Sequence, residues 1–109
     1  MKRYDKLVRD KIPAIAQAHG DVAHTRILTD DKEYLRALCD KLCEEAAEVH
    51  DTPSVEELAD TLEALLSIGK VLGYSPEQIE TARLKKAHER GGFDKRIFLI
   101  STAPQDNHV

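Results

Sequence analysis

The chain has no tryptophan, only three tyrosines and two phenylalanines, and only two cysteines among its 109 residues. A core with so few aromatic side chains must be built from leucine, isoleucine, valine and alanine, which suits packing between helices. Cys39 and Cys43 lie four residues apart in a segment with a helical pattern, so we do not expect a structural disulfide between them. A zinc site would need two further ligands, and the five histidines have no suitable spacing.

Long hydrophobic runs are missing as well. The longest apolar run is far shorter than the roughly 20 residues that a membrane helix needs, and the charged start of the chain lacks a signal-peptide pattern. We therefore expect a cytoplasmic protein that does not enter a membrane. Apolar residues make up 41% of the chain and charged residues 33%, which is typical of a soluble globular protein rather than a disordered one.

The length of the chain allows one domain with a modest core. We expect residues 1–100 to form this domain and residues 101–109 to form a flexible tail. A small domain that is this rich in charge often buries its apolar surface by associating with copies of itself. We therefore expect a homodimer or a higher homo-oligomer.

The chain also lacks an excess of positive charge, since its formal net charge is −4. This balance argues against a nucleic-acid partner, because a duplex binder needs a basic face. The basic residues gather near the two ends of the chain and the middle is acidic. The two basic groups are Lys2, Arg3, Lys6, Arg9 and Lys11, and Arg83, Lys85, Lys86, Arg90, Lys95 and Arg96. Basic ends around an acidic centre would suit a site for a metal and a polyphosphate, although ordinary solvated surfaces give the same pattern.

Capping signals divide the chain into helices. Asp30 with Glu33, Ser54 with Glu57, and Ser75 with Gln78 each have the spacing of a capping box, and glycines follow three of the helical patterns. These signals predict helices over residues 10–19, 31–49, 55–72 and 76–90. Residues 22–28 and 96–100 have strand character and could pair in a small two-stranded ribbon beside the helices.

Four carboxylates are the strongest functional signal in the sequence. The link 51–54 between the two longest predicted helices is short, so these helices must form an antiparallel hairpin. Glu45 and Glu48 stand near the end of the first helix, and Glu57 and Asp60 stand near the start of the second. The hairpin therefore brings the two pairs together, and the spacing of three residues puts each pair on one helix face.

A divalent cation would resolve the repulsion among these acids. Glu45 falls in the middle of an apolar stripe of its helix, where an unpaired carboxylate is costly. Oxygen ligands favour Mg²⁺, or Mn²⁺, over zinc or copper. Acidic patterns of this kind also occur on exposed helices without a metal, so the spacing alone leaves the two interpretations nearly balanced.

Three motifs carry a resemblance to a known superfamily. Lys41-Leu-x-Glu44-Glu45-x-x-Glu48 followed by Glu57-x-x-Asp60 resembles the all-α nucleoside triphosphate pyrophosphohydrolases, which include MazG-type enzymes and phosphoribosyl-ATP pyrophosphohydrolase. The opening motif, Tyr4 to Pro13, and the closing motif, Lys85 to Phe93, are similar to a short MazG-related branch of house-cleaning enzymes. The resemblance implies an all-α fold of the four-helix-bundle type with the helical hairpin as its core.

The resemblance also implies a reaction and roles for residues. The reaction is the magnesium-dependent hydrolysis of a non-standard nucleoside triphosphate to a monophosphate and pyrophosphate. The implied metal ligands are Glu45, Glu48, Glu57 and Asp60; the implied catalytic residues are Glu44, as the base for water, and Lys41. The implied phosphate-binding residues are Lys6, Arg9, Lys11, Lys86 and Arg90. A non-catalytic helical adaptor, or an inactive homologue that binds a partner protein or a nucleotide, is the alternative.

Overall fold

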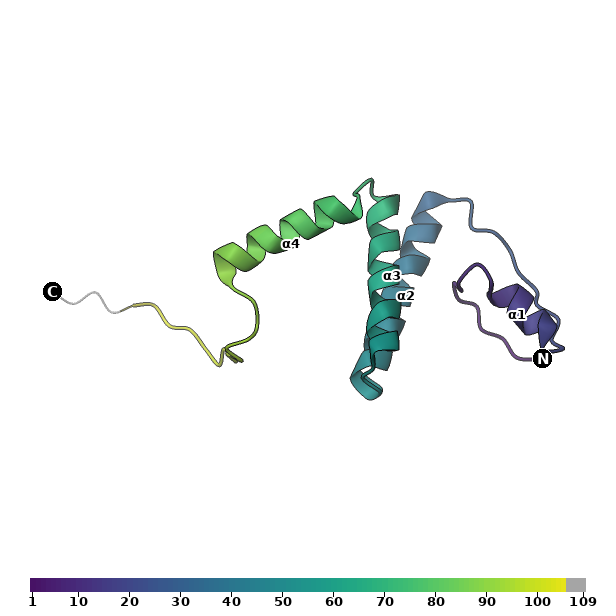
Figure 1. The fold of residues 1–109 in the computed structure, drawn as a ribbon, viewed down its shortest axis with the longest axis horizontal. Helices are drawn as coiled ribbons and strands as arrows, with labels where there is room; N and C mark the ends of the chain where they lie inside the picture. The colour runs from purple at the N-terminus through teal and green to yellow at the C-terminus, as the bar shows by residue number, and fades with distance from the viewer. Residues whose placement is uncertain (106–109) are drawn as a thin grey trace.

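Four helices make up the regular structure of residues 1–105, the part of the chain that the computed structural model describes (Figure 1). They are α1 (Ile12–Ala18), α2 (Asp31–Asp51), α3 (Val55–Val71) and α4 (Pro76–Arg90). The predicted all-helical class is confirmed, and each helix begins and ends within two residues of the predicted position.

Side-chain caps start the three longer helices where the sequence predicts. The Ser54 hydroxyl accepts a hydrogen bond from the backbone N–H of Glu57 at 3.1 Å. Ser75 and Gln78 form a full capping box, with bonds of 3.1 and 2.8 Å. The carboxylate of Asp30 accepts from the backbone N–H of Lys32 rather than from that of Glu33. Each cap satisfies a donor that the first helical turn cannot pair internally.

Helices α2 and α3 pack side by side as the predicted antiparallel hairpin (Figure 1). The core between them is small, since Leu38 and Ala64 are its only buried apolar side chains within residues 1–105. Ile68 and Val71 lie half-buried on the same side of α3 as Ala64. Glu45 is buried at this interface with 9% of its surface exposed, as its place in the apolar stripe of α2 predicts.

An irregular N-terminal strap, residues 2–11, lies against the hairpin ahead of α1. Leu7 and Val8 are half-buried, and two basic side chains of the strap contact acids of the hairpin. Helix α1 itself has no buried residue. The strap, rather than α1, is therefore the part of the N-terminal region that shapes the surface of the hairpin.

Helix α4 leaves the hairpin and points away from it (Figure 1). It contacts α3 near its own start, where Ile79 packs on Gly69 so closely that a Cβ at Gly69 would lie 2.5 Å from Ile79 Cδ1. The chain is consequently elongated, with extents of 76 × 31 × 23 Å and a radius of gyration of 19.9 Å. A compact domain of this length has a radius of gyration of about 13 Å.

The prediction that residues 22–28 and 96–100 pair in a two-stranded ribbon is wrong. Neither segment forms a strand, and they lie at opposite ends of the elongated chain (Figure 1). A lone two-stranded ribbon is marginal in water unless another element covers one face, and the departure of α4 carries 96–100 away from any such cover. The predicted tail, 101–109, has no regular structure over 101–105; residues 106–109 lie outside the described part of the chain.

In the part of the chain that the structure describes, no helix combines the length and the apolar character that crossing a membrane takes.

Candidate metal centre

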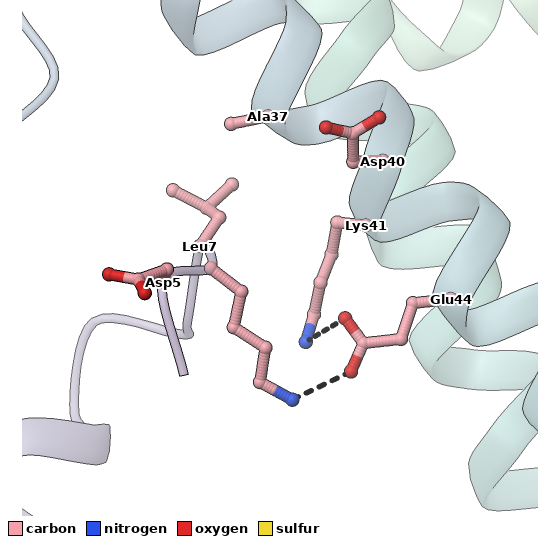
Figure 2. A pocket seen from close by; sticks show the side chains of 7 residues that line it. Asp5, Leu7, Ala37, Asp40, Lys41 and Glu44 are labelled. Atoms are coloured by element: carbon pink, nitrogen blue, oxygen red, sulfur yellow. Dashed lines mark hydrogen bonds and ion pairs between the residues drawn. The ribbon is translucent and has the colours of Figure 1, made fainter. Parts of the chain in front are cut away.

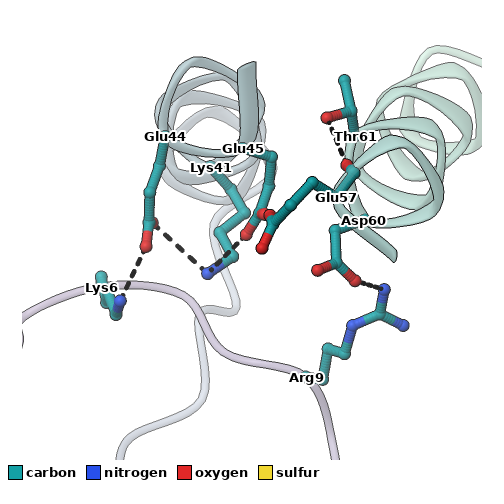
Figure 3. A network of polar contacts seen from close by, with 8 residues as sticks. All are labelled: Lys6, Arg9, Lys41, Glu44, Glu45, Glu57, Asp60 and Thr61. Atoms are coloured by element: carbon teal, nitrogen blue, oxygen red, sulfur yellow. Dashed lines mark hydrogen bonds and ion pairs between the residues drawn. The ribbon is translucent and has the colours of Figure 1, made fainter. Parts of the chain in front are cut away.

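Three carboxylates converge where α2 and α3 face each other. One oxygen each from Glu45, Glu57 and Asp60 lies within 4.8 Å of the other two. Glu45 comes from α2 and is buried, whereas Glu57 and Asp60 come from the first two turns of α3 and are half-buried. These side chains, seen together in Figure 3, are three of the four predicted ligands. We call them the carboxylate cluster.

Glu48, the fourth predicted ligand, stands apart from the carboxylate cluster. Its side chain is exposed, and it is not among the converging carboxylates. It remains close enough for its negative charge to act on Glu57. The helix explains this position, because residue 48 is one turn beyond Glu45 and rotates about 60° further from the apolar stripe of α2.

Three cations surround the carboxylates (Figure 3). Lys41 Nζ lies 3.3 Å from oxygens of both Glu44 and Glu45. From the strap, Lys6 Nζ lies 2.7 Å from Glu44 Oε1. Arg9, also in the strap, donates to Asp60 Oδ1 at 2.6 Å. The strap thus brings two of the predicted phosphate-binding residues to the hairpin's acids.

The electrostatics of the acids differ according to their neighbours. Partial burial raises the pKa of Glu57, and the negative charges of Asp60, Glu48, Glu45 and Glu56 raise it further. The hydrogen bond from Lys6 lowers the pKa of Glu44, and Lys41 lowers it further against the opposing effect of burial. Glu57 therefore experiences an excess of negative charge, whereas Glu44 has its charge balanced by two lysines.

An open groove of about 320 Å³ runs between the strap and the hairpin. Its walls combine Arg9, Lys41, Glu45 and Asp60 with apolar side chains such as Leu38. A smaller hollow of about 90 Å³ lies on the Lys6 side, between the strap and the face of α2 that carries Asp40, Lys41 and Glu44 (Figure 2). The groove therefore presents cations and carboxylates side by side on one open surface.

The remaining predicted phosphate-binding residues lie elsewhere in this chain. Lys11 is exposed at the start of α1, as its N-cap residue. Lys86 and Arg90 are exposed on the outer half of α4, which runs away from the hairpin (Figure 1). The structure therefore brings Lys6 and Arg9 to the carboxylates and does not bring Lys86 or Arg90 to them within one chain.

Sequence reasoning did not single out Tyr34, Ser67 and Glu63, which also line the groove. A signal for Tyr34 was present, because residues 34, 38, 41 and 45 follow the spacing of one helix face. Ser67 and Glu63 lack such a signal, because the path of the strap decides which face of α3 lines the groove.

Comparisons with known proteins found no family model that matches the chain, and no curated protein or solved structure that matches it.

Proposed function

We propose that this protein is a magnesium-dependent nucleoside triphosphate pyrophosphohydrolase of the MazG-like kind, with a house-cleaning role toward non-standard nucleotides. The observation that carries the proposal is the meeting of Glu45, Glu57 and Asp60 from two helices, beside cations supplied by a third segment. The motif resemblance joins that arrangement to this reaction. The metal, the substrate and the cytoplasmic location are parts of the same proposal.

The donor set suits a hard divalent cation. Octahedral Mg²⁺ holds oxygens at about 2.0–2.1 Å, which puts neighbouring ligand oxygens about 3 Å apart and opposite ones about 4 Å apart. The three carboxylate oxygens lie within 4.8 Å of one another, so small rotations of the half-buried Glu57 and Asp60 side chains suffice. Glu45, Glu57 and Asp60 would hold the ion, and Glu48 would reach it only by turning inward.

A bound magnesium ion would supply charge neutralisation of the phosphate oxygens. The chain's own cations would bind the rest of the polyphosphate. Arg9 is paired with Asp60 and half its side chain is exposed, so its guanidinium can turn from the carboxylate to a phosphate when the acids gain another counter-charge. Lys6 is placed in the same way on Glu44. Cations in these positions would stabilise the charge of the departing pyrophosphate.

The role of Glu44 follows from its two lysines. A carboxylate whose pKa is lowered is a weaker proton acceptor, because a general base works best with a pKa near the working pH. Glu44 is therefore better suited to positioning Lys6 and Lys41 than to removing a proton from water. Glu57, whose pKa is raised by partial burial and by its acidic neighbours, is one of the residues that would hold the ion.

A product assay tests the proposal. The wild-type chain should convert at least one triphosphate in a broad panel, with magnesium or manganese, into its monophosphate and pyrophosphate. Glu45→Gln should abolish this, while Glu56→Gln, which removes a neighbouring charge outside the carboxylate cluster, should retain it. Diphosphate plus phosphate as products would contradict cleavage between the α and β phosphates. An inactive panel would contradict the enzyme and favour the adaptor alternative.

A further inference from the structure

The groove between the strap and the hairpin changes character along its length. One end is charged, because Arg9 of the strap, Glu45 of α2 and Asp60 of α3 line it there (Figure 3). Further along the same face of α2, its wall is formed by Leu38, which is buried, and by Tyr34, which is half-buried. The groove therefore leads from a charged end, at the carboxylate cluster, to an apolar and aromatic end.

The rise of the two helices gives the groove a scale. Leu38 lies about 10 Å and Tyr34 about 16 Å along α2 from Glu45, at a rise of about 1.5 Å per residue. On α3, which runs in the opposite direction, Glu63 lies about 4.5 Å beyond Asp60. Glu63 therefore stands between the charged end and the apolar end. In a nucleotide, the sugar likewise separates the charged phosphates from the apolar faces of the base.

Glu63 differs from the other two acids of the hairpin that line the groove. Glu45 is paired with Lys41 at 3.3 Å, and Asp60 is paired with Arg9 at 2.6 Å. Within residues 1–105, Glu63 lines the groove without an ion pair or a hydrogen bond from another side chain. The acceptor positions of its carboxylate are therefore open to a ligand. A group that donates hydrogen bonds at this level of the groove would complement it.

We propose that the groove selects a ribonucleotide, with the Glu63 carboxylate accepting hydrogen bonds from the hydroxyl groups of the ribose. The inference rests on the proposed function, which puts the phosphates at the carboxylate cluster. The sugar then falls at the level of Glu63, one helical turn further along α3. An ionised carboxylate is a strong acceptor for two neighbouring hydroxyls, and the same pairing reads the ribose in dinucleotide-binding folds. A 2′-deoxyribose offers only one of these hydroxyls.

The far end of the groove suits the base of such a nucleotide. Leu38 and Ala64 are buried apolar side chains on facing helices, and Tyr34 closes the end of the groove with a half-buried aromatic ring. Apolar and aromatic surfaces bind the faces of every base. The Ser67 hydroxyl, which also lines the groove, can donate or accept a hydrogen bond and so favours no particular base edge. Selection by the sugar should therefore be stronger than selection by the base.

Binding of uncleavable analogues tests the inference without reference to activity. Equilibrium dialysis with magnesium compares α,β-methylene ribonucleoside triphosphates with their 2′-deoxy counterparts, for adenine, guanine, cytosine, uracil and hypoxanthine. For the base that binds best, the ribose form should bind at least about 10-fold more tightly, because the deoxyribose form leaves a hydrogen bond to a charged acceptor unmade. Equal affinities would overturn the inference and leave the proposed function standing. Binding of neither form would overturn both.

Four variants locate the selectivity in the same dialysis experiment. Glu63→Ala, at an exposed helix position that tolerates alanine, should weaken the ribose form and bring the two affinities to near equality. Tyr34→Leu should weaken both forms and keep their ratio. Asp10→Ala removes the groove-lining carboxylate of the strap, and Glu89→Ala removes an exposed carboxylate of α4; both should keep the ratio. A ratio lost in Asp10→Ala, or kept in Glu63→Ala, would overturn the assignment to Glu63.

Discussion

At the residue scale, the site has fewer cationic side chains than carboxylates. Lys41, Lys6 and Arg9 face four carboxylates, those of Glu44 and of the carboxylate cluster. Lys6 and Lys41 both contact Glu44, so two of the three positive charges compensate the charge of this one carboxylate. The excess of negative charge falls on Glu57, whose pKa is raised. A site of this kind gains most from a cation that binds Glu57 and Asp60 directly.

A substitution of Arg9 distinguishes the contribution of the strap to catalysis from its contribution to stability. Arg9→Gln removes a half-exposed ion pair with Asp60, and such pairs contribute about 0–1 kcal/mol to the free energy of unfolding. The loss of a cation at a developing phosphate charge should lower kcat/KM by on the order of 100-fold. Urea unfolding and the pyrophosphate assay measure the two effects. Arg3→Gln, which breaks an exposed pair with Asp5, is the matched control and should change neither; equal losses of activity in both variants would contradict the assigned role.

At the element scale, the caps and the short turn define the hairpin and therefore the carboxylate cluster. The link between α2 and α3 is only residues 52–54, and Ser54 in it caps α3 three residues before Glu57. The cap fixes the first turn of α3, from which Glu57 projects. The stability of the turn and the geometry of the site are thus linked by one hydrogen bond.

Ser54→Ala should lower the free energy of unfolding by about 1 kcal/mol, because the backbone N–H of Glu57 loses its acceptor. It should also weaken magnesium binding, since the first turn of α3 would fray. Thermal unfolding with and without magnesium measures both effects. Thr25→Ala, in an exposed irregular segment, controls for the loss of a hydroxyl, and a loss of stability as large as that of Ser54→Ala would argue against the capping role.

Gly69 sets the junction of α3 and α4. Gly69→Ala should change the free energy of unfolding by no more than about 1 kcal/mol, because the added Cβ meets Ile79 Cδ1, the end of a half-buried side chain that can turn aside, at 2.5 Å, and the gain in helix propensity opposes the cost of that shift. Ile79→Val removes that atom, so the double variant should be more stable than the sum of the two single changes predicts. Additive changes in chemical denaturation would mean that α4 does not contact α3 there.

The sequence was sufficient to predict the features that depend on contacts between residues close together in the chain. Ser54 and Ser75 mark helix starts through their own hydrogen bonds, and the brevity of the turn leaves an antiparallel hairpin as the only arrangement. The position of Glu45 in an apolar stripe correctly predicted its burial. Glu48 shows the limit of this reasoning, because the spacing of three residues allows two acids on one face without deciding whether both point inward.

Features that depend on contacts between residues far apart in the sequence could not be predicted in this way. Residues 96–100 have strand composition, but a strand needs a partner at the right place, and the direction of α4 decides where this segment lies. That direction follows from the packing of Ile79 on Gly69, which no capping signal reports. The pairing of Arg9 with Asp60 likewise required the path of the strap.

At the scale of the whole molecule, one chain is extended and poorly buried. Its apolar core within residues 1–105 consists of Leu38 and Ala64, which is too small to offset the loss of conformational entropy on folding. The stability of the protein should therefore come from association as much as from folding.

The melting temperature should accordingly rise with protein concentration, since a dimer that dissociates on unfolding is stabilised by mass action. A tenfold increase in concentration corresponds to about 1.4 kcal/mol per dimer. Differential scanning fluorimetry over a hundredfold range measures the shift, with Leu62→Asp, which places a charge among the exposed leucines of α3, as the variant that should lose the dependence. A wild-type melting temperature independent of concentration would contradict coupled folding and association.

The carboxylate cluster is the proposed metal site, and the magnesium dependence of protein stability is its decisive measurement. Magnesium at about 100 times its Kd should stabilise the wild type by about 2.7 kcal/mol, measured as a rise in melting temperature. Glu45→Gln and Asp60→Asn should remove the rise and Glu56→Gln should keep it. Glu48→Gln distinguishes three ligands from four: the rise should persist, reduced, if the converging carboxylates alone hold the ion. An equal rise in the wild type, Glu45→Gln and Glu56→Gln would contradict a metal site at the carboxylate cluster.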